Sequence, residues 1–171
     1  MTLEDILKLE DEADFNAAFA AYNELYEHGP SDFNLWKHYY FFLWAAIEDA
    51  PLEFRERVNL GQNLQKMYDE GKTQFRHLSD FKFIAGYTIT IFPYEFGNYE
   101  DLEKEGKELL RQAHEEEPDN KIYRMVYLGS LETVGEEYSK AEIEAGPVVL
   151  NKFSGPGLMN NYFSQVLNRK R

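Results

Sequence analysis

Apolar side chains recur every three or four residues along most of this chain, which is the spacing of one face of an α-helix. The first clear stripe covers residues 15–26 and stops at His28-Gly29-Pro30. The next apolar segment, residues 35–47, can begin at a cap formed by Ser31 or Asp32. Because its apolar residues leave almost no polar face, we expect this helix to be buried on most sides.

Proline and glycine mark the bounds of the next two segments. Pro51 predicts the start of a third helix and Gly71 its end, in the positions that these residue types prefer. Residues 78–92 fit a fourth helix, although residues 87–91 also alternate between aromatic or apolar and polar positions like a strand. We favour a helix here because a lone strand would have no partner. Pro93 ends the segment in either case.

Capping residues and turns predict the remaining boundaries. Helix starts are expected at three cap-like sequences, namely Asn98 with Asp101, Pro118-Asp119-Asn120, and Ser139 with Glu142. The second of these helices is expected to end at Gly135, and the third, a short one, at Gly146. A last helix, with apolar residues from Met159 to Leu167, follows the turn Gly155-Pro156-Gly157.

Together these segments predict an all-α fold with short connections. Short connections make successive helices antiparallel neighbours, so we expect stacked helical hairpins with about seven to eight helices. A length of 171 residues and a mass of 20.1 kDa suit one domain with a substantial core. We therefore predict a single helical domain over residues 1–171.

Two stretches resemble the tetratricopeptide repeat (TPR), a helix–turn–helix unit of about 34 residues. In the first, Asp14-Phe15-x-x-Ala18-x-x-x-Tyr22-x-x-Leu25 resembles the second helix of the motif, and Pro30 and Trp36 stand where its closing proline and the next tryptophan belong. In the second, residues 97–102 resemble the inter-helix turn and residues 118–120 the closing turn, although glycine occupies position 106, where an aromatic is usual. The resemblance implies a TPR-like solenoid or bundle and leaves function open.

Charge and composition exclude several function classes. The chain has 18 Lys and Arg against 31 Asp and Glu, a formal net charge of −13, and no cysteine. Such a surface repels phosphate backbones and anionic lipids, so we expect neither nucleic-acid nor membrane binding. Met1 to Asp5 shows no signal-peptide pattern, and no apolar run is long enough to span a membrane, which favours a cytoplasmic protein.

Catalytic and metal-binding patterns are missing from the local sequence. The histidines His28, His38, His77 and His114 are isolated, and no Gly-x-Ser-x-Gly or phosphate-loop sequence is present. Two histidines have an acid three residues later, Asp80 and Glu117 respectively, and we expect those pairs to make surface hydrogen bonds. The sequence therefore predicts no enzymatic activity, no metal and no cofactor.

Acidic residues are clustered. Residues 1–51 carry eleven acids and two bases, and residues 95–120 carry ten acids and three bases. A solvated helix face explains any one cluster, but several together indicate a field that steers a basic protein partner. Aromatic residues in the loop between Pro93 and Leu102 have little core to enter and can face the same partner. The candidate partner-binding residues are Glu10, Asp11, Glu12, Asp14, Tyr94, Phe96, Tyr99, Glu100, Asp101, Glu115, Glu116 and Glu117.

Two functional hypotheses from different classes fit these features. The end of the chain, from Phe153 through Asn160-Asn161-Tyr162-Phe163, is similar in style to bacterial polymorphic-toxin immunity proteins of the contact-dependent inhibition type. That resemblance implies a cytoplasmic inhibitor that covers the basic surface of a nuclease-type toxin domain. The alternative is a TPR-like adaptor that binds a peptide in a concave groove lined by Asn34, Lys37 and Phe41. A small helical enzyme or sensor is disfavoured by the missing catalytic patterns.

Overall fold

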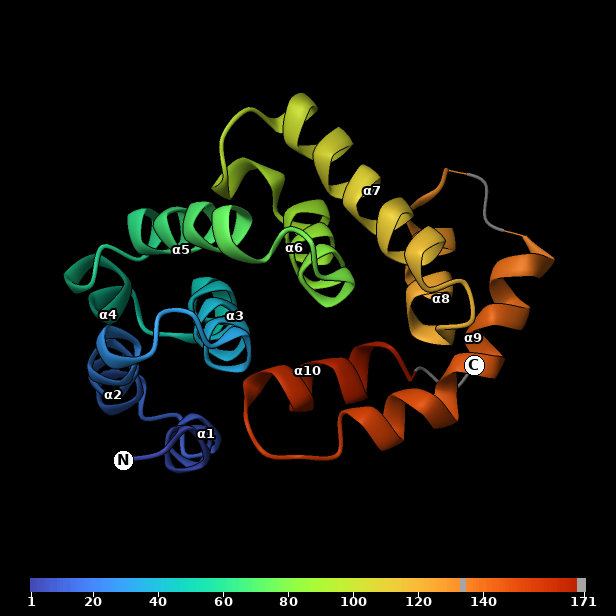
Figure 1. Ribbon diagram of the computed structural model, residues 1–171. Helices are drawn as coiled ribbons and strands as arrows, with labels where there is room; N and C mark the ends of the chain where they lie inside the picture. Colours follow the sequence, from blue (N-terminus) through green and yellow to red (C-terminus); the bar gives the residue numbers. More distant parts are fainter. Residues whose placement is uncertain (133–134, 169–171) are drawn as a thin grey trace. The chain divides into compact units, whose positions relative to one another are not determined.

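The protein is all-α. A computed structural model describes residues 1–132 and 135–168, and every regular element in those ranges is a helix (Figure 1). This confirms the predicted fold class. The contacts within the chain define two compact units: unit 1 holds Met1–Gln74 and Phe153–Tyr162, and unit 2 holds the described residues from Phe75 to Lys152 and from Phe163 onward. The prediction that the whole chain folds as one domain stays a prediction.

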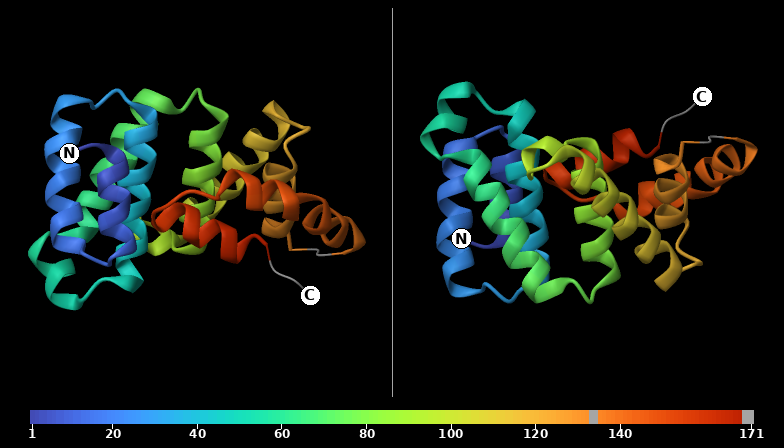
Figure 2. Two further views of the ribbon diagram at one scale, coloured as in Figure 1. Left: turned by 90° about the horizontal axis from the view of Figure 1, so that it is seen from below. Right: turned by 90° about the horizontal axis from the view of Figure 1, so that it is seen from above.

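Unit 1 contains the N-terminal helices. Helix α2 packs against both α1 and α3, and the axes of these three helices run roughly parallel to one another (Figure 2). The elements of this unit are α1 (Leu3–Asp11), α2 (Phe15–His28), α3 (Phe33–Asp49), α4 (Leu52–Arg57), most of α5 (Leu60–Phe75) and the first part of α10 (Leu158–Val166).

Helix α1 is absent from the sequence prediction, although a local signal for it exists. Thr2 and Asp5 form a capping box: the Asp5 carboxylate accepts the Thr2 N–H at 2.9 Å, and the Thr2 hydroxyl accepts the Asp5 N–H at 3.3 Å. Ile6 and Leu7 follow and are buried. The sequence Thr-x-x-Asp before an apolar pair therefore marks a helix start that the search for longer apolar stripes overlooks.

Helix α3 is the centre of unit 1, as its apolar pattern predicts. The Asp32 carboxylate caps its start by accepting the N–H groups of the second and third residues. Trp36 has 0% exposed surface, stacks on Tyr40 with ring centroids 4.8 Å apart, and donates its indole N–H to the Met67 carbonyl at 2.9 Å. The buried aromatic run thus forms core, and the Met67 bond ties α3 to α5.

The single helix predicted from Pro51 to Gly71 is wrong in two places. The chain breaks into α4 and α5 near Asn59, which has a φ of 52°, a left-handed conformation that asparagine adopts more readily than most residues. Gly71 lies inside α5 instead of ending it. A Cβ at Gly71 would lie 2.2 Å from Cζ2 of Trp36, so glycine stands here to make room for the indole ring.

Unit 2 contains the helices that follow. Helix α7 packs against α6 and α8, and α8 packs against α9 (Figure 1). Its elements are α6 (Ser79–Ile91), the short 3₁₀ helix η1 (Pro93–Glu95), α7 (Tyr99–Glu116), α8 (Lys121–Ser130), α9 (Glu136–Lys152) and the last part of α10.

Helix α6 confirms that the alternating segment, residues 87–91, is helical. The two threonines fit because each hydroxyl donates to a carbonyl of the preceding turn: Thr88 to Ile84 at 2.9 Å, and Thr90 to Gly86 at 2.7 Å. Apolar residues on both sides of α6 are buried, which explains why its apolar pattern is not confined to one stripe.

Helices α6 and α7 approach each other closely at two glycines. A Cβ on Gly86 would lie 2.9 Å from the Gly106 carbonyl oxygen. A Cβ on Gly106 would lie 2.6 Å from the Thr90 hydroxyl and 3.1 Å from the Gly86 carbonyl oxygen. This contact explains why position 106 holds glycine where the tetratricopeptide pattern usually has an aromatic ring.

Three later boundaries are confirmed and three are wrong. Asn98 and Asn120 cap α7 and α8 as predicted, and α10 follows the predicted turn. Helix α8, however, ends at Ser130 and not at Gly135, and position 134, which was placed in that helix, lies outside the described residues. Helix α9 has no break at Gly146, and no cap at Ser139, whose N–H donates to the Gly135 carbonyl at 3.2 Å.

Helix α9 continues through Pro147 because its packing face is continuous. Ala141, Ala145 and Val149 follow at four-residue spacing and are all buried. Proline inside a helix costs about 3 kcal/mol. The burial of this face on both sides of the proline offsets that cost.

Among the described helices, none combines the length and the hydropathy that crossing a bilayer requires.

Candidate functional site

The first acidic cluster is only partly available to a partner. Glu10 is 5% exposed, and its carboxylate accepts the Tyr22 hydroxyl at 2.8 Å and the Leu158 N–H at 3.3 Å. Asp11 accepts the Gly157 N–H at 3.0 Å and the Asn161 side-chain amide at 2.8 Å. Glu10 is therefore a buried residue of unit 1, which corrects its place among the surface candidates.

The other two acids of this cluster remain on the surface. Glu12 is exposed and follows the last residue of α1. Asp14 is exposed and caps α2, where its carboxylate accepts the Ala17 N–H at 3.0 Å. Replacing Asp14 would therefore change the stability of α2 as well as the surface charge.

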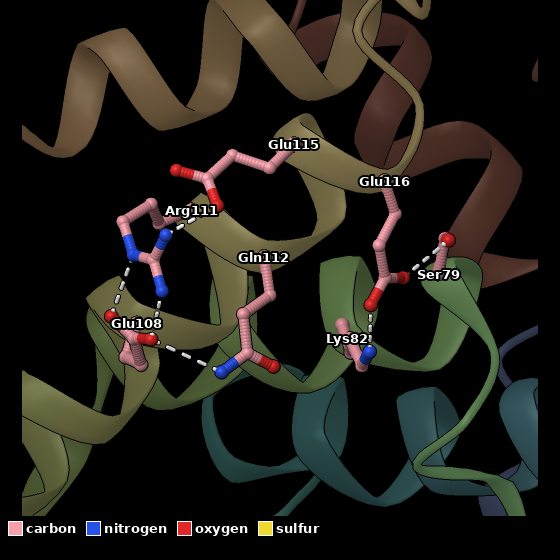
Figure 3. Close-up of polar contacts among 7 residues, drawn as sticks. All are labelled: Ser79, Lys82, Glu108, Arg111, Gln112, Glu115 and Glu116. Atoms are coloured by element: carbon pink, nitrogen blue, oxygen red, sulfur yellow. Dashed lines mark hydrogen bonds and ion pairs between the residues drawn. The ribbon is translucent and has the colours of Figure 1, made fainter.

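The C-terminal acidic cluster of α7 is compensated by neighbouring bases (Figure 3). Arg111 pairs with Glu108 and Glu115 along α7, and its hydrogen bonds hold the pKa of Glu108 at about 2. Glu116 pairs with Lys82 of α6. The Ser79 hydroxyl also donates to Glu116, at 2.7 Å.

Glu116 therefore has a structural role between α6 and α7. Burial by itself would raise the pKa of Glu116, but the hydrogen bonds from Lys82 and Ser79 outweigh it and leave the pKa lowered. Glu117 is exposed at the end of α7. Because two of the three consecutive acids hold ion pairs, substitutions here would change the stability of unit 2 together with its charge.

The connection between α6 and α7 presents aromatic residues to solvent. Tyr94 on η1 is 60% exposed and Tyr99, the first residue of α7, is 54% exposed. Ile91, at the end of α6, is also exposed, and the sequence reasoning missed it. Phe96 is only 6% exposed, so its ring belongs to the core of unit 2, which corrects its expected place on the surface.

Carboxylates lie close to these exposed rings in the sequence. Glu100 and Asp101 are exposed in the first turn of α7, which begins where the Asn98 side chain accepts the Asp101 N–H at 3.2 Å. Residues 91–103 contain four acids and no lysine or arginine. Within the described ranges, no ion pair joins Glu95, Glu100 or Asp101 to a base, in contrast to Glu115 and Glu116.

Six residues of the connection between α6 and α7 form a surface that we call the α6–α7 patch. The patch combines three apolar or aromatic side chains with three carboxylates on one short stretch of chain, where η1 contacts both α6 and α7. Its members are Ile91, Tyr94, Glu95, Tyr99, Glu100 and Asp101.

A second exposed apolar surface lies on α9. Ile143 is 77% exposed, and Leu150 and Pro147 are exposed as well, on the side of the helix away from its buried alanines. The signal that could have found this surface is the spacing of the three residues at i, i+4 and i+7. The predicted break at Gly146 hid that spacing.

The histidines lie apart from any metal-binding group within the described residues. His38 is buried in α3, and burial lowers its pKa to about 4. Asp80 does not form the surface pair expected with His77 and instead accepts the Tyr123 hydroxyl at 3.0 Å. In the part of the chain that the structure describes, no group of three or more His, Cys, Asp or Glu side chains is placed to hold a metal ion.

The groove expected for a peptide-binding adaptor lacks one of its three residues. Phe41 is fully buried and packs against Trp44 and Tyr162, with ring centroids 5.1 Å and 5.5 Å away. Asn34 is exposed and Lys37 is half-buried. Phe41 therefore cannot contact a peptide from a solvent-exposed groove.

No family model, curated protein or solved structure matches this chain. The resemblances to tetratricopeptide repeats and to immunity proteins stay predictions. Of the two exposed apolar surfaces, the α6–α7 patch is the one that combines exposed aromatic rings with carboxylates that no ion pair joins to a base within the described ranges.

Proposed function

We propose that this protein is a non-catalytic binding module that captures a basic protein partner. We further propose that it acts in the cytoplasm as an immunity or inhibitor protein that neutralises a nuclease-type toxin domain. One observation carries the proposal: the α6–α7 patch exposes Tyr94 and Tyr99 next in sequence to carboxylates that no ion pair joins to a base among the described residues.

The chemistry of the patch suits lysine and arginine. The face of a tyrosine ring attracts a cation, and a carboxylate forms charge-assisted hydrogen bonds with an ammonium or guanidinium group. Tyrosine is also enriched at protein interfaces because it adds contact area and a hydroxyl group at a low cost in side-chain entropy. A protein that binds nucleic acid carries lysine and arginine on its binding surface, which an acidic aromatic patch complements.

The charge of the whole chain supports the same partner. A net charge of −13 attracts a basic protein over distances longer than the contact itself, which raises the association rate at low salt. The exposed acids outside the patch contribute to this field. The patch supplies the short-range contacts that long-range attraction lacks.

We expect neutralisation of the patch to slow association. The double variant Glu100→Gln with Asp101→Asn should lower the on-rate by roughly tenfold at low salt, and this difference should shrink as salt screens the charges. The partner is sought as a basic, nuclease-type domain encoded directly upstream of the gene, and the purified domain is mixed with the full chain in stopped-flow measurements. Co-expression with that domain should restore growth, which tests the inhibitor role directly.

A matched control removes the same charge elsewhere. Glu24 and Glu27 of α2 are exposed, and Glu24→Gln with Glu27→Gln removes the same number of negative charges as the patch variant. The control should reduce the on-rate less than the patch variant does. Equal reductions would mean that net charge alone steers the partner, and a partner that binds both variants like the wild type would contradict the proposed surface.

The tyrosines test the short-range part of the proposal. Tyr94→Ala with Tyr99→Ala should raise the dissociation rate, because exposed aromatic residues that become buried at an interface act mainly on complex lifetime. The thermal stability of the free protein should stay close to that of the wild type, since both rings are exposed. An unchanged dissociation rate would place the interface outside the patch.

A further inference from the structure

Helix α1 is joined to a distant part of the chain by two neighbouring carboxylates. Glu10 accepts the Leu158 N–H at 3.3 Å, and Asp11 accepts the Gly157 N–H at 3.0 Å and the Asn161 side-chain amide at 2.8 Å. All of these residues belong to unit 1. The contact therefore holds the N-terminal helix against the turn that precedes α10 and against its first residues.

The turn fits tightly against α1. Gly157 has a φ of 99°, a conformation that favours glycine. A Cβ at this position would lie 2.8 Å from Cδ2 of Leu7, so a larger residue would also push the turn away from α1. We call this contact between α1 and residues 157–161 the N-terminal clasp.

Glu10 is the one carboxylate of the clasp that is buried from water. The titratable groups that face it are Tyr22 of α2, which stacks on Tyr39 of α3 with ring centroids 4.8 Å apart, and the neighbouring Asp11. The first residue of α10 contributes the Leu158 N–H. These groups include no cation that could compensate an ionised Glu10.

Protonation of Glu10 removes the buried charge, keeps the hydrogen bond from Leu158 and reverses the direction of the hydrogen bond with Tyr22. The protonated carboxyl can donate its O–H to the Tyr22 oxygen while its other oxygen still accepts the Leu158 N–H. Burial raises the pKa of Glu10 to about 7, although the hydrogen bonds from Tyr22 and Leu158 lower it. A neutral Glu10 therefore suits this site better than an ionised one.

We propose that the N-terminal clasp is controlled by a proton: it is tightest when Glu10 is protonated and loosens when Glu10 ionises. In the opened clasp Glu10 meets water, where a glutamate ionises at its ordinary pKa near 4.5. The closed form binds the proton more strongly, so closure is most favourable below about pH 4.5 and weakens as the pH rises to about 7. This inference does not depend on the identity of the partner.

Hydrogen exchange of the full chain measures the opening of the clasp. The probes are the Leu158 amide and the amides of α1, followed by NMR and expressed as protection factors so that the intrinsic pH dependence of exchange is removed. Between pH 5 and pH 8 the protection of these amides should fall by roughly seventyfold in the wild type, which is the factor that a pKa change from 4.5 to about 7 implies.

Two variants identify the group responsible. Glu10→Gln keeps the shape and both hydrogen bonds but cannot ionise, so its protection factors should stay nearly constant between pH 5 and pH 8. Glu12→Gln removes an exposed carboxylate from the end of the same helix and should keep the pH dependence of the wild type. Identical pH dependence in the wild type and in Glu10→Gln would overturn the proposal.

A third variant tests the local chemistry. The Tyr22 hydroxyl stabilises the ionised carboxylate, so Tyr22→Phe should raise the pH at which Glu10 titrates, measured from the ¹³C shift of its carboxyl carbon.

In the wild-type protein, the clasp amides should also exchange faster than the amides of α3 at every pH. Equal protection in α1 and α3 would show that the proton acts on all of unit 1, which contradicts a local clasp.

Discussion

Replacing Trp36 with alanine is expected to lower the free energy of unfolding by about 3–5 kcal/mol, the range for truncating a fully buried large aromatic. The change removes the stack on Tyr40 and leaves the Met67 carbonyl without the indole N–H that it accepts at 2.9 Å. It also leaves a cavity next to Gly71, whose missing Cβ makes room for this ring. Urea unfolding followed by far-UV circular dichroism measures the loss.

The control for this prediction is an aromatic residue on the surface. Tyr94→Ala removes a ring that is mostly exposed, and its free energy of unfolding should stay within about 0.5 kcal/mol of the wild-type value. If Trp36→Ala unfolded at the same urea concentration as Tyr94→Ala, the buried position of Trp36 and the alignment of α3 with α5 would both be wrong.

Gly106→Val should destabilise unit 2 by about 3 kcal/mol, the upper part of the range for overpacking. Its Cβ would lie 2.6 Å from the Thr90 hydroxyl, which is held by its bond to the Gly86 carbonyl. Relief of the contact requires α6 and α7 to move apart. The same unfolding measurement detects this loss, and a helical content close to that of the wild type would show that the helices themselves survive.

The matched control is Gly61→Val in α5, where nothing lies within 4 Å of an added Cβ. Helix propensity favours valine over glycine slightly, so this variant should differ from the wild type by less than about 1 kcal/mol. A Gly106 variant as stable as the Gly61 variant would mean that α6 and α7 do not approach each other closely at position 106.

Glycine and proline are the residues at which sequence reasoning failed most often. Gly71 was expected to end a helix, and Gly146 with Pro147 to separate two helices, because these residues break helices in isolation. In the folded chain, Gly71 accommodates the Trp36 ring, and the buried Ala145 and Val149 carry α9 through the proline. Trp36 is distant from Gly71 in sequence, and the burial of Ala145 and Val149 depends on packing against another helix, so no local pattern contains either effect.

The acidic residues illustrate the same limit for the candidate surface. In the sequence, Glu10, Glu100 and Glu116 are alike, because each belongs to an acidic cluster. The fold buries the first, exposes the second and pairs the third with Lys82. Burial and pairing depend on which helices meet, so the sequence could predict the acidic character of the surface but not which acids remain available to a partner.

The sequence by itself determined the features that depend on neighbours within one or two turns of helix. The spacing of apolar residues specified the all-α fold. Helix starts were specified by Asp32, Asn98 and Asn120, whose side chains accept backbone N–H groups two or three residues away. The tertiary structure decided where α5 and α9 continue past residues that break isolated helices. It also decided which carboxylates are buried, because removal from water requires segments as distant in sequence as Glu10 and Leu158 to pack together.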